Sequence, residues 1–377
     1  MNRPYDLGIL GGGQLARMST QAAQRMGLKV ACLEHGTDTP AGQITTQING
    51  FLTDSHAIAE IMELCDFLTL ENEFVPAHMI RSACEIAGRD EDCILPGIDT
   101  LETIQDKLLQ RQAYARYGAP TPKAVPINPD DPKSAMDAIG FPCVLKARFG
   151  GYDGKGTRTA MTPPDFVKYE DLWKQGGWLV EEFVPFRREL AVMVYRSKTD
   201  TGVFPTMETI QTNHVCDLVF PSGTDARAVA ISAVEAVDGY GLFGVELFET
   251  ERGDFLINEI APRPHNTGHY TLDWGGISQF EQHVRLAMHF PCEKPVGQDC
   301  AMANLLGIEN AVDWKNGLRQ AMIDVPNCHV HWYGKAESRP GRKMGHLNIQ
   351  GDNCRDLADK ARESFYRGWA APGPDLG

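Results

Sequence analysis

Residues 241–263 read GLFGVELFETERGDFLINEIAPR, and this stretch predicts the part of the fold on which function depends. Apolar residues flank an Arg252-Gly253 pair on both sides, which predicts a β-hairpin turning there. If the strands pair about that turn, Glu246 lies directly opposite Glu259. The large apolar neighbours on both strands indicate that the hairpin is buried; they are Leu247, Phe248, Phe255, Leu256 and Ile257.

Two facing carboxylates in a buried hairpin repel each other unless one is protonated or a cation lies between them. Asn258 adds a neutral oxygen beside Glu259. A set of oxygen ligands favours Mg²⁺, which typically joins a few carboxylates to substrate phosphates. We therefore predict a magnesium site at Glu246, Asn258 and Glu259; the alternative is an exposed hairpin edge that tolerates its charges.

The residues that follow the hairpin, APRPHNTGHY, are rich in polar groups. Arg263 and Asn266 suit the binding of a small oxyanion beside the metal. His265 and His269 are four residues apart, but Pro264 and the Asn-Thr-Gly run argue against a helix. We therefore expect structural histidines rather than a zinc site built from a histidine pair.

A second motif, KARFGGYDGKGT, spans residues 146–157. Lys155 is followed by Gly156, so the motif lacks the GK[ST] ending of a P-loop. It joins two expected strands, and a basic glycine-rich loop of this kind can fold over phosphates as a lid. Lys146 is expected to direct its ammonium toward phosphate oxygens. The alternative is a solvent-exposed hairpin with an extended lysine.

The first 97 residues alternate strands and helices, which predicts an open parallel sheet. Gly11, Gly13 and Ala16 fit the G-x-G-x-x-G/A spacing, and Glu34 stands where a ribose-binding acid of a dinucleotide site would lie. A tight strand-to-helix turn without a ligand is the alternative. Beyond this sheet, one helix is expected over residues 100–118 and short strands dominate from residue 143.

Length and composition exclude several classes of protein. The 377 residues suggest two or three domains, and 36 basic against 50 acidic residues give a net charge of −14, which disfavours nucleic acid as the main partner. No stretch approaches the ~20 apolar residues of a membrane helix, and no signal peptide is recognisable, so we expect a cytoplasmic protein with no membrane partner. The ten cysteines form no CxxC pair, which favours reduced, buried thiols.

Seven stretches together resemble the ATP-grasp enzymes and, among them, the N5-carboxyaminoimidazole ribonucleotide synthetases of purine biosynthesis. They are GILGGGQLARM, TLENEFVP, QDKLLQ, FGGYDGKGT, EEFVPFRREL, NEIAPRPHNTGH and WYGKAESRPGRKMGHLNI, from residue 8 to residue 349. The resemblance implies an α/β protein with ATP-grasp architecture. Its parts would be a Rossmann-like domain over residues 1–97, an ATP-grasp domain over 98–297 with a lid at about 120–185, and a small C-terminal domain over 298–377.

The resemblance also implies a reaction: ATP and bicarbonate carboxylate 5-aminoimidazole ribonucleotide through carboxyphosphate, with release of ADP and phosphate. ATP is then a substrate, Mg²⁺ the cofactor, and small molecules the only ligands of an expected homodimer. Arg263, Asn266, Lys146 and Asp153 would be the catalytic group.

Carried over position by position, the resemblance assigns nucleotide contacts to Lys107, Lys146, Gly151, Tyr152, Asp153, Gly154, Lys155, Gly156, Thr157, Glu181, Glu182, Phe183, Val184, Glu189, His214, Asn258 and Glu259. It assigns ribonucleotide contacts to Gln14, Leu15, Glu73, Tyr152, Asp153, Lys335, Arg342 and Lys343. Two positions depart from the family pattern, since Thr157 replaces the usual Gln and Lys107 replaces a common Arg.

Three alternatives stay open at the level of sequence. One is another ATP-grasp carboxylate–amine ligase, either formate-dependent and acting on glycinamide ribonucleotide or similar to biotin carboxylase. Another is a dinucleotide-dependent oxidoreductase built on Gly11, Gly13 and Glu34. The last is a nucleotide-sensing module that binds ATP without turnover.

Overall fold

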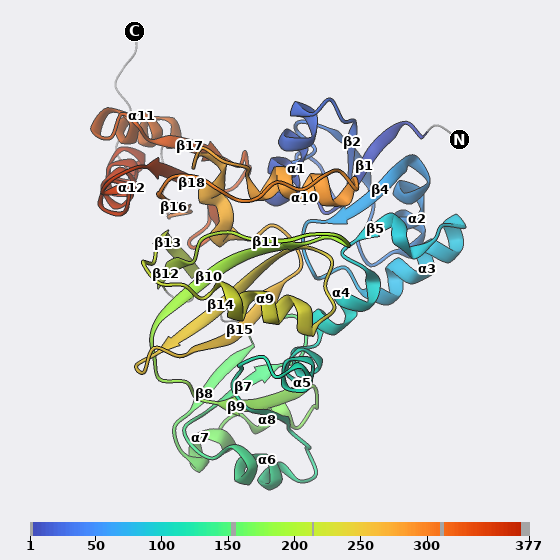
Figure 1. The fold of residues 1–377 in the computed structure, drawn as a ribbon, viewed down its shortest axis with the longest axis vertical. Coiled ribbons are helices and arrows are strands. Elements are labelled where there is room, and N and C mark those ends of the chain that lie inside the picture. The colour runs from blue at the N-terminus through green and yellow to red at the C-terminus, as the bar shows by residue number, and fades with distance from the viewer. Residues whose placement is uncertain (1–2, 152–155, 213–214, 310–312, 371–377) are drawn as a thin grey trace.

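The computed structural model describes residues 3–151, 156–212, 215–309 and 313–370. Its strands form three sheets of five, nine and four strands, with helices packed against them (Figure 1). The four-stranded sheet projects from one end of the molecule, at the bottom of Figure 1, while the five-stranded sheet lies beside the large one. The predicted α/β class with an N-terminal open parallel sheet is confirmed.

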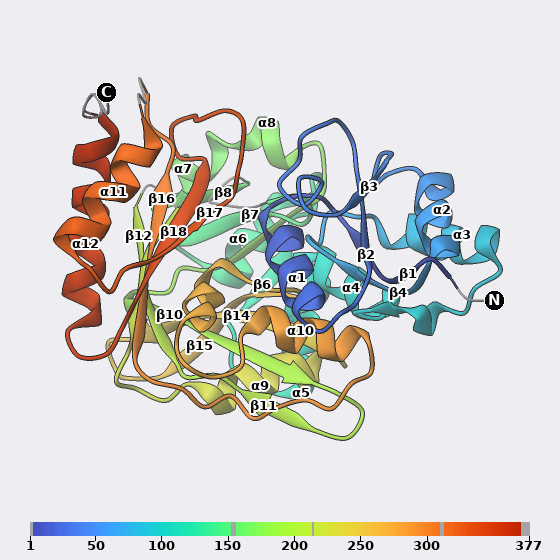
Figure 2. The same ribbon diagram turned by 90° about the horizontal axis from the view of Figure 1, so that it is seen from above.

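The N-terminal sheet is parallel throughout, with strand order β3-β2-β1-β4-β5. Leu7 and Ile9 of β1 pack with α1 and α10 on one face, whereas Leu10 packs with α2 and α3 on the other. Since α10 belongs to the central part of the chain, this packing docks the N-terminal sheet on the rest of the molecule, as Figure 2 shows. The elements are β1 (Tyr5–Leu10), α1 (Gln14–Arg25), β2 (Val30–Glu34), β3 (Thr46–Asn49), α2 (Ser55–Leu64), β4 (Cys65–Leu70), α3 (Ala77–Ala87), η1 (Glu91–Cys93) and β5 (Ile94–Leu95).

The prediction of one continuous helix over residues 100–118 is wrong. The helix breaks at Asp106 into α4 (Ile98–Gln105) and α5 (Lys107–Tyr117). Asp106 has an extended backbone, and its carboxylate accepts a hydrogen bond from the N–H of Leu108 at 2.9 Å while it pairs with the guanidinium of Arg148. Asp is a strong helix N-cap residue, so α5 restarts here and places Lys107 in its first turn.

The small sheet is antiparallel, with order β6-β9-β7-β8 and a buried core of its own. The glycine-rich motif joins β7 to β8, as predicted, so it lies at a hairpin end and not before a helix. The elements are β6 (Ala124–Pro126), α6 (Pro132–Ile139), β7 (Cys143–Ala147), β8 (Thr157–Ala160), α7 (Pro163–Val167), α8 (Glu170–Trp173) and β9 (Trp178–Glu182).

The large sheet is antiparallel, with order β15-β14-β10-β12-β13-β16-β18-β17 and β11 beside β10. Its central elements are β10 (Phe186–Arg196), β11 (Thr201–Val203), β12 (Met207–Thr212), β13 (Val215–Pro221), α9 (Arg227–Ala236), β14 (Gly241–Thr250), β15 (Phe255–Ala261), η2 (Asn266–Leu272) and α10 (Gln279–Ala287).

The C-terminal section extends this same sheet instead of forming one of its own. Leu218 and Val219 of β13 pair with Ala303 and Met302 of β16. The loop before β18, residues 335–342, carries Lys335, Arg339 and Arg342 and is called the basic loop below. The continuous hydrogen bonding fixes this loop relative to the central hairpin. The elements are β16 (Cys300–Leu306), α11 (Trp314–Asp324), β17 (His329–Trp332), β18 (Lys343–Gln350) and α12 (Cys354–Ala370).

The cysteines agree with the predicted reduced state. All ten are free thiols; nine are buried and Cys292 is half-buried. Burial raises the pKa of the Cys32 thiol to about 12, which keeps it protonated. Within the described ranges, no helix combines the length and the apolar composition that crossing a membrane requires.

The break at Asp106 gives a testable expectation for stability. Asp106→Ala removes both the α5 N-cap and the partner of Arg148, and loss of an N-cap alone costs roughly 0.5–2 kcal/mol. We expect a lower Tm by calorimetry, with Asp106→Asn in between because it keeps a capping oxygen but not the charge. Equal Tm values for Asp106→Ala and the unaltered chain would contradict this account.

Candidate active site

The hairpin of β14 and β15 brings the two predicted metal ligands together. Glu246 pairs with Glu259, as the sequence predicted, whereas the next pair is Leu247 with Ile257. Asn258 is therefore an extra residue, and β15 carries a β-bulge at this point. Bulges re-aim side chains beside active sites, and here one brings the Asn258 amide next to the facing carboxylates.

The predicted register is correct although the predicted turn is not. The N–H of Thr250 donates to the carbonyl of Asp254 at 2.9 Å, and Glu249 pairs with Phe255, one position away from the pairing that a tight turn at Arg252-Gly253 would give. The bulge farther along the strand adds the missing residue. Two local deviations therefore cancel before the pair of carboxylates is reached.

The two carboxyl groups have different charge states. Burial, together with the charges of Glu259 and Glu189, raises the pKa of Glu246 to about 7. Burial acts in the same direction on Glu259, but the Lys107 ammonium, whose Nζ lies 2.7 Å from Oε1, lowers its pKa below the usual value. One group is thus ionised at neutral pH while the other is near its midpoint, which is the electrostatic condition that a bound cation relieves.

A second lysine lies on the other side of the bulge. The Nζ of Lys146 donates to Asn258 Oδ1 at 3.1 Å and lies 2.5 Å from Glu181 Oε1. In the described part of the chain, no group of three or more His, Cys, Asp or Glu side chains is arranged to hold a metal. The two carboxylates and one amide nevertheless fit Mg²⁺, which takes its remaining oxygens from water or phosphate.

Arg111 of α5 and Glu181 of β9 form a buried ion pair behind these lysines. Both side chains are almost fully buried, and the Arg111 Nε donates to Glu181 Oε2 at 3.0 Å. Glu181 was predicted to contact the nucleotide, and the structure adds a role for its side chain, since its carboxylate lies between Arg111 and Lys146.

The other predicted nucleotide contacts that the structure describes lie on β7 to β10 or on the segments between these strands. Thr157 pairs with Lys146 across β7 and β8, and Gly156 has a φ of +83° that favours glycine. Glu182 accepts a hydrogen bond from the N–H of Lys123 at 3.0 Å. Gly151, Phe183, Val184 and Glu189 lie on the surrounding segments. Predictions at Tyr152, Asp153, Gly154, Lys155 and His214 lie outside the described residues.

Arg263 and Glu73 connect the central part to the N-terminal sheet. The guanidinium Nε and Nη2 of Arg263 donate to the two carboxylate oxygens of Glu73 at 2.5 and 2.9 Å. Burial opposes the Arg263 charge, but Glu73 raises its pKa above the usual value. The predicted oxyanion residue and a predicted ribonucleotide contact therefore adjoin in one site.

Two neighbours of Arg263 make contacts on different sides, His265 with the carboxylate pair and Asn266 with β16. His265 Nε2 lies 3.6 Å from Glu246 Oε1, and burial holds the pKa of His265 well below its usual value, so the ring is neutral. Asn266 exchanges hydrogen bonds with the fully buried Asn304 of β16, at 3.1 Å in one direction and 2.5 Å in the other. His265 was expected to be a structural residue, but its ring lies close to Glu246 of the carboxylate pair.

The N-terminal glycine turn is closed by acidic side chains. Gly13 and Leu15 donate their N–H groups to Glu71 at 2.5 and 3.1 Å, and Gly12 donates to Glu34 at 3.0 Å. These are the amides that a dinucleotide pyrophosphate would need. Glu34 thus caps the turn, and the predicted alternative of a ribose-binding Glu34 is wrong for this structure. The side chains of Gln14 and Leu15 follow directly at the start of α1.

The basic loop lies near this turn. Lys335 Nζ donates to the carbonyl of Lys343 at 2.7 Å, and Arg342 donates to the carbonyl of Glu337 at 2.8 Å. Burial, and next the charge of Arg342, lowers the pKa of Lys335 to about 8, while the Glu71 carboxylate opposes that change. A dianionic phosphate bound here would restore the full charge of Lys335.

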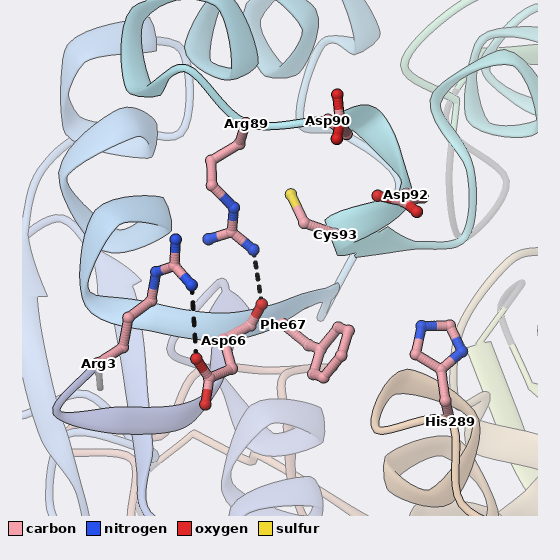
Figure 3. A pocket seen from close by; sticks show the side chains of 8 residues that line it. All are labelled: Arg3, Asp66, Phe67, Arg89, Asp90, Asp92, Cys93 and His289. Atoms are coloured by element: carbon pink, nitrogen blue, oxygen red, sulfur yellow. Dashed lines mark hydrogen bonds and ion pairs between the residues drawn. The ribbon is translucent and has the colours of Figure 1, made fainter. Parts of the chain in front are cut away.

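Two cavities lie away from this site. One of about 330 Å³ lies between the N-terminal sheet and the end of α10, where Arg89 points toward the Asp66 carbonyl and His289 faces it from the other side (Figure 3). Another of about 490 Å³ lies beside the β10–β11 turn. None of the predicted site residues lines either cavity, so the convergence of charged side chains locates the site.

Sequence reasoning missed residues that complete the arrangement. Arg111 follows Lys107 by one helical turn, and this spacing signalled it. Glu71 lies two residues before Glu73 in the same motif, but it reaches the glycine turn only through the pairing of β4 with β1. Asn304 carries no local signal, because only the pairing of β16 with β13 brings it to Asn266.

Comparisons with known proteins agree with this arrangement. Residues 5–105 match the ribonucleotide synthetase preATP-grasp domain, residues 112–280 the ATP-grasp domain, and residues 300–360 the phosphoribosylaminoimidazole carboxylase C-terminal domain. The chain is 38% identical to an N5-carboxyaminoimidazole ribonucleotide synthase of Synechococcus elongatus, over 98% of this chain and 96% of that one. It is 35% identical to the phosphoribosylaminoimidazole carboxylase of Saccharomyces cerevisiae over 91% of this chain, and the match covers 63% of that longer protein.

A solved structure has the same fold. The N5-carboxyaminoimidazole synthase of Aspergillus clavatus, in complex with ADP and 5-aminoimidazole ribonucleotide, superposes with a TM-score of 0.86 at 28% identity, over 97% of this chain and all of that one. The fold and the paired lysines and carboxylates define an ATP-grasp protein. Within that class, the chain belongs to the N5-carboxyaminoimidazole ribonucleotide synthase family.

The raised pKa of Glu246 predicts a pH effect. The folded-state pKa of about 7 exceeds the ordinary value of 4.5, so protonation of Glu246 favours the folded state, and this contribution is lost as pH rises from about 4.5 to 7. Without divalent cations, the Tm of Glu246→Gln minus the Tm of the unaltered chain should therefore increase as pH rises from 5 to 8, because only the unaltered chain has to ionise Glu246. A Tm difference that is constant across this range would contradict the assignment.

Proposed function

We propose that this chain uses ATP and bicarbonate to carboxylate 5-aminoimidazole ribonucleotide, giving N5-carboxyaminoimidazole ribonucleotide, ADP and phosphate. The observation that carries the proposal is the Glu246–Glu259 pair, flanked by Lys107 and Lys146 and adjoining the Arg263–Glu73 junction. Relatives of the same family support it, including a structure that holds ADP and the ribonucleotide.

The first step activates bicarbonate, which is a poor electrophile. A bicarbonate oxygen attacks the γ-phosphorus of ATP, the bond to ADP breaks, and carboxyphosphate forms. Lys107 and Lys146 neutralise phosphate charge, which is the main form of catalysis for this transfer. Mg²⁺ held by Glu246, Asn258 and Glu259 would supply further charge neutralisation at the phosphates.

Arg263 and Asn266 hold the bicarbonate in this proposal. Glu73 keeps Arg263 charged and oriented, while the contact with Asn304 fixes the Asn266 amide. The neutral ring of His265 lies beside the same space and offers a polar contact without added charge. Holding bicarbonate in a fixed orientation beside bound ATP raises the reaction rate strongly, because the two reactants no longer have to meet by diffusion.

The second step transfers the carboxyl group to the exocyclic amine of the ribonucleotide. Carboxyphosphate releases its phosphate, a carbon–nitrogen bond forms, and the amine loses a proton. Gln14 and Leu15 at the glycine turn are proposed to face the imidazole, with Lys335, Arg342 and Lys343 at the 5′-phosphate. The nearness of Lys335 to Glu71 supports one shared ribonucleotide site.

The remaining expectations complete the proposal. They are Mg²⁺ as the cation, a homodimer, a cytoplasmic location, and domain boundaries at residues 97/98 and 297/298. Replacing bicarbonate by formate, or the ribonucleotide by glycinamide ribonucleotide or free biotin, separates the other ATP-grasp ligases. The occupied amides of the glycine turn argue against a dinucleotide-dependent oxidoreductase.

The metal ligands give the most direct test by mutation. Purified protein should release ADP in a manner that depends on bicarbonate and rises with the ribonucleotide, and Glu259→Gln should lose most of this turnover because the cation loses a carboxylate. Glu251→Gln, at the exposed tip of the same hairpin, is the matched control and should be unaffected. Near-normal kcat in Glu259→Gln would refute the metal assignment.

The basic loop gives a separate test. Arg342→Ala should raise KM for the ribonucleotide about tenfold, since one charge-assisted phosphate contact is lost, while background ATP hydrolysis with bicarbonate survives. Arg339→Ala in the same loop is the control, because its exposed side chain pairs only loosely with Glu337, at 3.7 Å. If Arg342→Ala instead abolishes ATP binding, Arg342 belongs to the nucleotide site.

A further inference from the structure

Arg111 contacts both the small sheet and the bulged hairpin. It lies one helical turn after Lys107 on α5, so both side chains leave the same face of that helix. Lys107 reaches Glu259, whereas Arg111 reaches Glu181 and the backbone of β15. One face of α5 thus contacts Glu259 of the carboxylate pair and also Glu181 of β9, which is a partner of Lys146.

The contacts of Arg111 coincide with the bulge. Its Nη1 donates to the carbonyl of Ile257 at 3.3 Å and its Nη2 to the carbonyl of Asn258 at 2.8 Å. A bulge interrupts the hydrogen-bond ladder and leaves backbone groups that need other partners. A planar guanidinium serves two adjacent carbonyls and a carboxylate at once, which a lysine ammonium cannot do in the same geometry.

The same guanidinium also determines where Lys146 is held. Glu181 divides its carboxylate between Arg111 on one oxygen and Lys146 on the other. Lys146 then reaches Asn258 Oδ1, which closes a ring of contacts from α5 through β9 and β7 to β15. Arg111 and Glu181 are buried, the Lys146 side chain is 12% exposed, and Asn258 is half-buried. Breaking such a network leaves unpaired charges in a poorly solvated place.

We infer that Arg111 is a positioning residue for the nucleotide and metal site: it fixes the bulge and the Glu181 carboxylate so that Asn258 and Lys146 face the same space as Glu246 and Glu259. This inference rests on the proposed nucleotide and metal site but not on the carboxylation step. Arg111 does not itself contact the reacting groups.

The test measures binding of ADP with Mn²⁺, by calorimetry on the full chain, and so does not depend on turnover. Arg111→Lys keeps the charge but loses the planar fork. It should weaken Mn²⁺-dependent ADP binding by about tenfold, because the Asn258 carbonyl loses its guanidinium donor. Binding of the ribonucleotide should stay within about twofold, because its site lies at the glycine turn and basic loop.

Arg89→Lys is the matched control. The fork of Arg89 also donates to backbone carbonyls, those of Met62, Cys65 and Asp66, but in the N-terminal sheet. The Arg89→Lys substitution should lower the Tm and leave ADP binding unchanged. If Arg111→Lys lowers Tm but binds ADP and Mn²⁺ as Arg89→Lys does, Arg111 is only structural and the inference is overturned.

Glu181→Gln provides a second route if Arg111→Lys folds poorly. It breaks the same ring from the other side with little change in volume, so it should reproduce the loss of Mn²⁺-dependent binding; unchanged binding would overturn the inference. If the unaltered chain fails to bind ADP with Mn²⁺, the proposed nucleotide site falls and the inference with it. If it binds ADP with Mn²⁺ but does not carboxylate the ribonucleotide, only the proposed function falls.

Discussion

Repulsion between Glu246 and Glu259 is the constraint around which the rest of the site is arranged. The hairpin register forces the two carboxylates to face each other in a partly buried place. Lys107 neutralises one of them, and the other is left with a pKa of about 7. Such a pair is costly in an empty site and favourable beside a divalent cation and a polyphosphate, so its presence points to binding of that kind.

The three sheets converge on this pair. The small sheet contributes Lys146 and Glu181, the N-terminal sheet contributes Glu73 to Arg263, and the C-terminal strands contribute Asn304 to Asn266. Each link crosses between parts of the chain that are distant in sequence. The site is therefore assembled by tertiary packing, and the continuous large sheet holds its central and C-terminal components in register.

The sequence predicted those features that local chemistry determines. The parallel sheet and the β7–β8 hairpin followed from strand patterns and glycine spacing. The facing glutamates were also predicted, although the turn from which their pairing was counted lies one position away from Arg252-Gly253 and the bulge restores the register. It did not predict the bulge at Asn258 or the helix break at Asp106, which depend on hydrogen bonds to groups outside the local segment. Nor did it identify Asn304 or the closure of the glycine turn by Glu71, because those contacts exist only once distant strands are paired.

The central claim is that Glu246 and Glu259 hold a divalent cation against the phosphates of a nucleotide. Anomalous diffraction from a crystal grown with ADP and Mn²⁺ tests it most directly. The account predicts a manganese peak between the two carboxylates and in contact with a phosphate oxygen. A nucleotide bound with no peak there, or with the peak at other side chains, would contradict it.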